Sequence, residues 1–379
     1  MSGKKWVSIF VGIMLCTLLF IASMNFFVDP FEYFKYTSGE YIEYPNRSTI
    51  YTRYIKAKYV QKYGKEYDAY VLGGSKSGAL RTDKLQEWDG YNYYNNWLFS
   101  GNFREYKLYT DFIIDNTNVK KILLHISGPE VRRFNRESYG DVFVTPAVVT
   151  GDSEIKEVIK FLGKNIKPGL TKLTNNLKKD TTVLYPVTLT GEMDLGRLYG
   201  QMEEKGPESY AEKYVLYDYD ESLEKLFYQD PSVVAINSNL TAMKQIRDKC
   251  KENDVELVVV IGATALTELY EYECEEYREY LREMVSIFGE VWDFSGPNPV
   301  TMNPYNFYNE SHYNVEVGNQ MIEIMSGKTS MNDFGILLTK RNIDQYLDSR
   351  QTSYENLKEE YDATGTIDLS EYTYEKRIH

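Results

Sequence analysis

The feature that most constrains this chain is a long apolar stretch near its start. From Trp6 to Val28 the sequence contains no charged side chain. A helix over that stretch rises roughly 34 Å, which is enough to cross the roughly 30 Å hydrocarbon core of a bilayer. The sequence therefore predicts a transmembrane anchor at residues 6–28, with the lipid bilayer as its surroundings.

Charges on either side of this stretch predict its orientation. Lys4 and Lys5 precede it and Asp29 follows it, so the positive-inside rule makes residues 1–5 a cytoplasmic tail. A cleaved signal peptide is the alternative, but a cleavage site needs small residues, and this stretch ends in Met24-Asn25-Phe26-Phe27-Val28. We expect a single-pass protein of the cell membrane whose main domain is extracytoplasmic.

Charge and cysteine content argue against several classes of function. The formal net charge is -13, whereas nucleic-acid binding needs clustered Lys and Arg, so no nucleic acid is expected as a partner. The chain has 3 Cys and no C-x-x-C pair, which argues against a zinc or redox site of that kind. We expect neither a metal nor a cofactor.

Strand-like and helix-like segments alternate after the anchor, as in βαβ units that build a parallel sheet covered on both faces. The expected strands are 67–72, 91–95, 121–126, 255–262 and 290–294. The expected helices are 49–63, 79–87, 104–115, 231–253, 273–288 and 315–326.

These elements predict the division of the chain. A juxtamembrane helical segment covers 29–65, an α/β domain covers 66–330 with an insertion at about 140–230, and 331–379 is a C-terminal extension. In an open sheet of this kind, functional side chains lie beyond the carboxyl ends of the strands.

A candidate nucleophile follows the first expected strand. In Gly73-Gly74-Ser75-Lys76-Ser77-Gly78 the glycines allow a sharp turn that exposes the Ser75 hydroxyl. Ser77 is the competing hydroxyl. A serine that only caps a helix is the structural alternative. A phosphate-binding loop is a third interpretation, but the Walker pattern is not met.

A serine nucleophile needs a base, normally histidine, and the chain contains 3 His. His379 is the last residue, and His125 falls within an expected strand. His312 follows a loop rich in Asn and Pro and precedes a helix, which places it at the rim of the sheet. His312 is therefore the candidate base, with a helix-capping histidine as the alternative.

The order of these motifs resembles the SGNH (GDSL-like) hydrolase superfamily. The nucleophile turn at Ser75 comes first, and His312 comes last with the polar Asn309 three residues before it. The anchor, Val28-Asp29-Pro30 and the segment 307–313 resemble more narrowly its membrane-anchored, DltD-like and alginate-acetylation-like branch. The resemblance implies a flavodoxin-like, SGNH-type sheet of five parallel strands flanked by helices.

The resemblance also implies roles for individual residues. Ser75 matches the nucleophile and His312 the base. The backbone N–H groups of Ser75 and Gly101 match the oxyanion hole, and Asn102 or Ser127 would supply the donor that the family takes from a third-block Asn.

Asn309 stands where the family usually has Asp. An Asn can orient the imidazole, but it cannot offset the charge of an imidazolium as a carboxylate does. Glu310 and Asp293 are the possible alternative acids.

Members of this branch move acyl groups onto envelope polymers beside membrane-bound O-acyltransferases. The resemblance therefore implies transfer of an acetyl or D-alanyl group to a cell-envelope polysaccharide or teichoic acid, with a membrane-bound O-acyltransferase as partner. A carbohydrate esterase of the same fold is one alternative, and a non-catalytic anchored accessory or binding protein is another. The acidic net charge favours a neutral glycan as acceptor, or else a local basic groove, for which Arg47, Arg53 and Lys76 are candidates.

Overall fold

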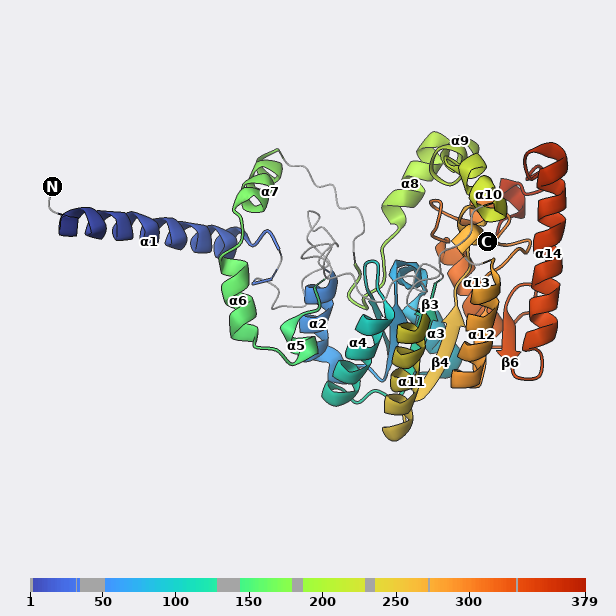
Figure 1. Cartoon of the computed structure of the whole chain (residues 1–379), viewed down its shortest axis with the longest axis horizontal. Helices are drawn as coiled ribbons and strands as arrows, with labels where there is room; N and C mark the ends of the chain where they lie inside the picture. Colours follow the sequence, from blue (N-terminus) through green and yellow to red (C-terminus); the bar gives the residue numbers. More distant parts are fainter. Residues whose placement is uncertain are drawn as a thin grey trace.

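The computed structural model describes residues 3–31, 33–34, 52–127, 144–178, 187–228, 236–271, 273–331 and 333–379. Within these ranges a six-stranded sheet lies inside an α/β body, and one long helix projects away from it (Figure 1). The strands are β1 (Ala69–Gly73), β2 (Tyr93–Trp97), β3 (Lys121–Ile126), β4 (Glu256–Ile261), β5 (Glu290–Asp293) and β6 (Ile336–Thr339).

The sheet has the order β2-β1-β3-β4-β5-β6. Strands β1 to β5 pair in parallel, whereas β6 pairs antiparallel with β5. The α/β class is therefore confirmed, but the prediction of a purely parallel, five-stranded, flavodoxin-like sheet is wrong. The additional strand pairs antiparallel and so falls outside the βαβ alternation that predicted the parallel strands. It comes from the segment expected to be a C-terminal extension.

Helices cover both faces of the sheet. Three helices pack side by side and connect strands in the direction from β2 towards β5. They are α4 (Phe103–Asn116), α11 (Ile236–Glu252) and α12 (Glu275–Phe288). α3 (Thr82–Asp89) connects β1 to β2 in the opposite direction and packs with α13 (Val315–Met325). Since parallel crossovers are right-handed, the two groups lie on opposite faces.

Three neighbouring strands are fully buried, although β2 forms one edge of the sheet and carries polar side chains. All residues of β1, β2 and β3 are buried, including Asn95. The Asn95 amide donates to the backbone oxygens of Ser77 at 2.8 Å and Leu80 at 3.0 Å. It therefore satisfies the backbone of the turn that follows β1.

Helix α1 (Gly3–Val28) is long and apolar enough to cross a membrane, as the sequence predicts for 6–28. Its side chains are mostly exposed, but Asn25 is buried where α1 meets the body. The Asn25 amide donates to the backbone oxygens of Leu162 at 3.0 Å and Lys164 at 2.7 Å. The next helix along the described chain is α2 (Thr52–Tyr63), and residues 49–51 of the predicted helix lie outside the described residues.

The insertion forms two separate groups of helices (Figure 1). α6 (Glu154–Leu162) and α7 (Lys167–Leu177) lie at the end of α1, and α5 (Ala147–Thr150) packs against α2, α4 and α6. α8 (Gly196–Lys205), α9 (Pro207–Tyr214) and α10 (Tyr219–Tyr228) lie at the other end of the body, towards α14 (Ile343–Thr364). Short 3-10 helices complete the described elements: η3 (Gly64–Glu66), η4 (Ser75–Ala79), η8 (Leu266–Glu271), η9 (Pro304–Asn306) and η10 (Tyr374–Lys376).

Candidate active site

Ser75 lies where the sequence places it, directly beyond the carboxyl end of β1. It begins η4 and is half-buried. Gly73 has to be glycine here, because a Cβ would lie 2.6 Å from the backbone oxygen of His125 on the neighbouring strand β3. The close approach of the two strands thus fixes the start of the turn.

The competing hydroxyl of Ser77 has a structural partner. Ser77 is buried, and its Oγ donates to the backbone oxygen of Gly74 at 2.8 Å. The Ser77 backbone N–H also donates to that oxygen, at 3.1 Å. Ser77 therefore closes the η4 turn and leaves Ser75 as the hydroxyl at its opening.

His312 comes from the loop between η9 and α13, and several contacts hold that loop. The Tyr308 N–H donates to the His312 backbone oxygen at 3.0 Å, and the two rings are stacked with centroids 5.4 Å apart. The Tyr210 hydroxyl of α9 donates to the Tyr308 backbone oxygen at 2.9 Å. The insertion therefore contributes directly to the position of His312.

The structure brings Ser75 and His312 together. Ser75 Oγ and His312 Nε2 lie 2.7 Å apart, which is a hydrogen bond. This geometry allows Nε2 to accept the serine proton, as a general base must.

The other ring nitrogen of His312 has two neutral partners. His312 Nδ1 lies 3.0 Å from Asn309 Oδ1 and 2.7 Å from Ser311 Oγ. Asn309 Oδ1 also accepts the backbone N–H groups of Ser311 at 3.0 Å and His312 at 2.9 Å. An amide oxygen can only accept, so Asn309 favours a proton on Nδ1 and leaves the Nε2 lone pair directed at Ser75.

Burial, together with the positive charge of Lys76, lowers the pKa of His312 to about 3. The neutral imidazole is therefore the stable form around pH 7. Its partners in the structure carry no negative charge that would favour the imidazolium. The site thus presents a base that is ready to accept a proton but weakly basic.

The two predicted alternative acids have other surroundings. The Asp293 carboxylate accepts from the Ser295 hydroxyl at 2.7 Å and the Tyr346 hydroxyl at 2.8 Å, and it lies 3.5 Å from Arg350. These contacts fasten α14 to the end of β5. Glu310 accepts the Thr267 hydroxyl with its backbone oxygen at 2.7 Å, which helps to hold the histidine loop.

The predicted oxyanion donors Gly101 and Asn102 have intramolecular partners. The Gly101 N–H donates to the backbone oxygen of Leu98 at 3.2 Å. Asn102 is the N-cap of α4, and its amide donates to Glu105 Oε2 at 2.6 Å. Asn102 is thereby committed to the helix start. Ser127 is buried at the end of β3.

The two described candidates for a local basic groove, Arg53 and Lys76, are buried and paired with carboxylates. Arg53 is fully buried and forms an ion pair with the buried Glu105. Lys76 is almost fully buried and paired with Glu268. Both cations are neutralised by carboxylates from distant parts of the chain, which composition cannot reveal. Arg47 lies outside the described residues.

Sequence reasoning missed Ser311 and Glu268. Ser311 directly precedes His312, so its contact with Nδ1 could have been anticipated from adjacency. Glu268 comes from η8, after β4, and its pairing with Lys76 depends on the packing of two loops. Within the described ranges, no group of three or more His, Cys, Asp or Glu side chains is placed to hold a metal ion.

No family model matches the chain, and no curated protein matches it. The resemblance to SGNH hydrolases therefore stays a prediction that rests on the motifs quoted above.

Proposed function

We propose that the protein is a membrane-anchored serine acyltransferase of the cell envelope. The observation that carries this proposal is the 2.7 Å contact between Ser75 Oγ and His312 Nε2, with Asn309 on the opposite ring nitrogen. A nucleophile, a base and a group that orients the base are what acyl transfer through a serine ester requires.

The reaction proceeds in two halves. Ser75 Oγ attacks the carbonyl carbon of an acyl donor while its proton passes to His312 Nε2. The tetrahedral intermediate collapses to acyl-Ser75, and the leaving group takes the proton from His312. A hydroxyl of the acceptor then attacks the ester and gives its proton to Nε2, and Ser75 recovers a proton as the acyl product leaves.

The negative oxygen of the intermediate needs hydrogen-bond donors. Ser75 begins η4, and the first N–H groups of a helical turn have no partner within it, so the Ser75 N–H is available to this oxygen. The Gly101 N–H can donate to this oxygen only if it gives up its hydrogen bond to the Leu98 backbone oxygen. Removal of one such donor typically costs about 3–4 kcal/mol of transition-state stabilisation.

Helix α1 supports a place at the membrane. We propose that it is an uncleaved anchor with the α/β body outside the cytoplasm, as Lys4 and Lys5 favour. The acyl donor would come from a membrane-bound O-acyltransferase, and the acceptor would be a polysaccharide or teichoic-acid hydroxyl. The net charge of -13 favours a neutral glycan, because the two described candidates for a basic groove are paired with carboxylates.

A fluorophosphonate probe tests the nucleophile in the full chain, in detergent or membranes. The wild type and the Ser77→Ala variant should label, and the Ser75→Ala variant should not. Labelling that persists in Ser75→Ala, or a folded wild type that never labels, would contradict the mechanism.

A second assay distinguishes transfer from hydrolysis. Labelled acyl donor is supplied to the full chain with and without envelope glycan. Ester on the glycan supports transfer, whereas release of free acid at the same rate with and without glycan indicates the esterase. Retention of envelope acylation in cells that carry both Ser75→Ala and His312→Ala would indicate an accessory protein.

A further inference from the structure

Two helices of the insertion expose apolar side chains beside the end of α1. Among the described residues outside α1, eight large apolar side chains are exposed, and five of them lie in α6 and α7. They are Ile155, Ile159, Leu170, Leu173 and Leu177, and their exposed fractions are 74%, 63%, 47%, 39% and 85%. Such a concentration on neighbouring helices marks an interaction surface rather than scattered exposure.

The spacing places these side chains on one face of each helix. Ile155 and Ile159 are four residues apart on α6, and Leu170, Leu173 and Leu177 follow at intervals of three and four on α7. The opposite side of α6 packs inward, where Phe161 is fully buried against Tyr33 and Tyr54. Each helix thus exposes an apolar stripe, and we call the two stripes together the α6–α7 face.

Contacts fix this face at the outer end of α1. Besides the bonds from Asn25 to the segment between α6 and α7, the Lys172 ammonium donates to the backbone oxygen of Asp29 at 2.9 Å. A Cβ at Gly169 would lie 3.8 Å from Met24 and 3.9 Å from Val28. The start of α7 therefore rests against the last turn of α1.

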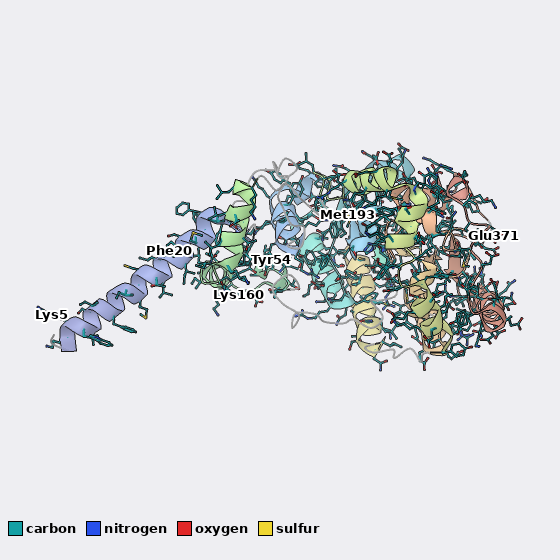
Figure 2. The ribbon with its side chains drawn as sticks, turned by 90° about the horizontal axis from the view of Figure 1, so that it is seen from above. Lys5, Phe20, Tyr54, Lys160, Met193 and Glu371 are labelled. Carbon is teal, nitrogen blue, oxygen red and sulfur yellow. The ribbon has the colours of Figure 1, made fainter. Side chains whose placement is uncertain are left out.

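The orientation of the helices suits a surface rather than a span. α6 and α7 cross the end of α1 instead of continuing along it (Figure 1), and Lys160 of α6 lies where α1 meets the body (Figure 2). An apolar helix from Trp6 to Val28 rises roughly 34 Å, slightly more than the hydrocarbon core. Its last turn, and with it α6 and α7, then lies at the level of the lipid headgroups.

The charge of this segment is opposite to that of the whole chain. Its lysines are Lys156, Lys160, Lys164, Lys167, Lys172 and Lys178, and its acidic residues are Glu154 and Glu157. Glu157 is turned inward, where it accepts from the Tyr33 hydroxyl at 3.0 Å and the Ala147 N–H at 2.8 Å. Lysine-rich amphipathic helices with an apolar face are typical of helices that lie in the interface of an anionic membrane.

We propose that the α6–α7 face lies in the headgroup region of the outer leaflet and binds anionic lipid, so that α1, α6 and α7 together hold the body against the bilayer. This inference rests on the anchoring of α1 proposed above. The bilayer is favoured over a protein partner because lysines outnumber acidic residues in this segment and the face stands at the level where α1 leaves the membrane.

Tryptophan quenching by bromine in lipid acyl chains tests the inference. The full chain is reconstituted without other protein into vesicles of phosphatidylcholine and phosphatidylglycerol. The variants Ile159→Trp and Leu177→Trp each add an indole to the face. The matched control Tyr217→Trp adds one at a side chain that is 57% exposed between α9 and α10, away from α1. Trp6 of α1 is quenched in every variant. The emission lost in the wild type is therefore subtracted from the emission lost in each variant, so that only the added indole is measured.

We expect bromolipid to remove emission from the Ile159→Trp and Leu177→Trp indoles and to leave the Tyr217→Trp indole unaffected. Replacement of phosphatidylglycerol by phosphatidylcholine should reduce the quenching on the face. If the added indoles of all three variants stay equally open to iodide in the water phase, the face does not bind lipid, and a protein partner is the occupant instead.

The same vesicles separate this inference from the proposed catalysis. Fluorophosphonate labelling of Ser75 should persist in the variants of the face. Quenching without any labelling of the wild type would contradict acyl transfer and leave the membrane contact standing. Labelling without quenching would contradict the membrane contact alone. A full chain that fails to float with vesicles would overturn both the anchor and this inference.

Discussion

Ser75 Oγ and His312 Nε2 lie 2.7 Å apart, although 237 positions separate the two residues in the chain. The turn after β1 carries the serine, and the loop that follows β5 carries the histidine. Both leave the sheet at the carboxyl ends of parallel strands, so the topology itself brings them to one edge. The opposite ring nitrogen of His312 contacts Asn309, which is neutral where a catalytic triad has a carboxylate. The first two predictions follow from this neutral partner.

The pH profile of the reaction should lack the usual acid limb near pH 6.5. Because the pKa of His312 is lowered to about 3, the imidazole stays neutral, and so able to accept a proton, at all pH values well above 3. The rate of fluorophosphonate labelling should therefore change little between about pH 7 and pH 5 and fall only towards pH 3. A midpoint near 6.5 would contradict the surroundings described for His312.

The Asn309→Asp variant should raise the pH at which the rate of labelling falls. A carboxylate beside Nδ1 favours the imidazolium and raises the pKa of an adjacent base by about 1–3 units. It also stabilises the imidazolium that forms in the transition state, so labelling at pH 7 should become faster. Ser311→Ala is the matched control, because it removes a neutral contact and adds no charge. An unchanged pH profile in Asn309→Asp would show that Asn309 does not orient His312.

The buried pair of Arg53 and Glu105 should matter for stability. Glu105 receives Arg53 from α2 and the Asn102 amide from the start of α4. Glu105→Gln leaves the Arg53 charge buried without its carboxylate, which typically costs about 3–5 kcal/mol.

Denaturant unfolding of the full chain in detergent measures this cost. The double variant Arg53→Met/Glu105→Leu should recover much of the free energy of unfolding, since it removes both charges. Equal losses in the single and double variants would show that side-chain packing, and not the unpaired charge, determines the effect.

The sequence predicts part of this architecture well, for physical reasons. The apolar stretch of α1 and the strand-turn-helix at Ser75 are local patterns, and the rule on carboxyl ends of parallel strands directs attention to His312. Strand β6 was not predicted because it pairs antiparallel, outside the βαβ alternation on which the other strands were recognised. The carboxylates paired with Arg53 and Lys76 escaped it because each partner is distant in sequence. The contacts of Asp293 with α14 were not predicted either, because Tyr346 and Arg350 are also distant from it in sequence.

Trapping the acyl-enzyme tests directly whether Ser75 is the nucleophile. The full chain is mixed with p-nitrophenyl acetate, quenched in acid within the first turnover, digested and analysed by mass spectrometry. We expect one acetyl group on the peptide that contains Ser75, its loss in Ser75→Ala and a strongly slowed appearance in His312→Ala. Acetyl groups that form at the same rate in all three proteins, or on a peptide without Ser75, would contradict a nucleophilic Ser75.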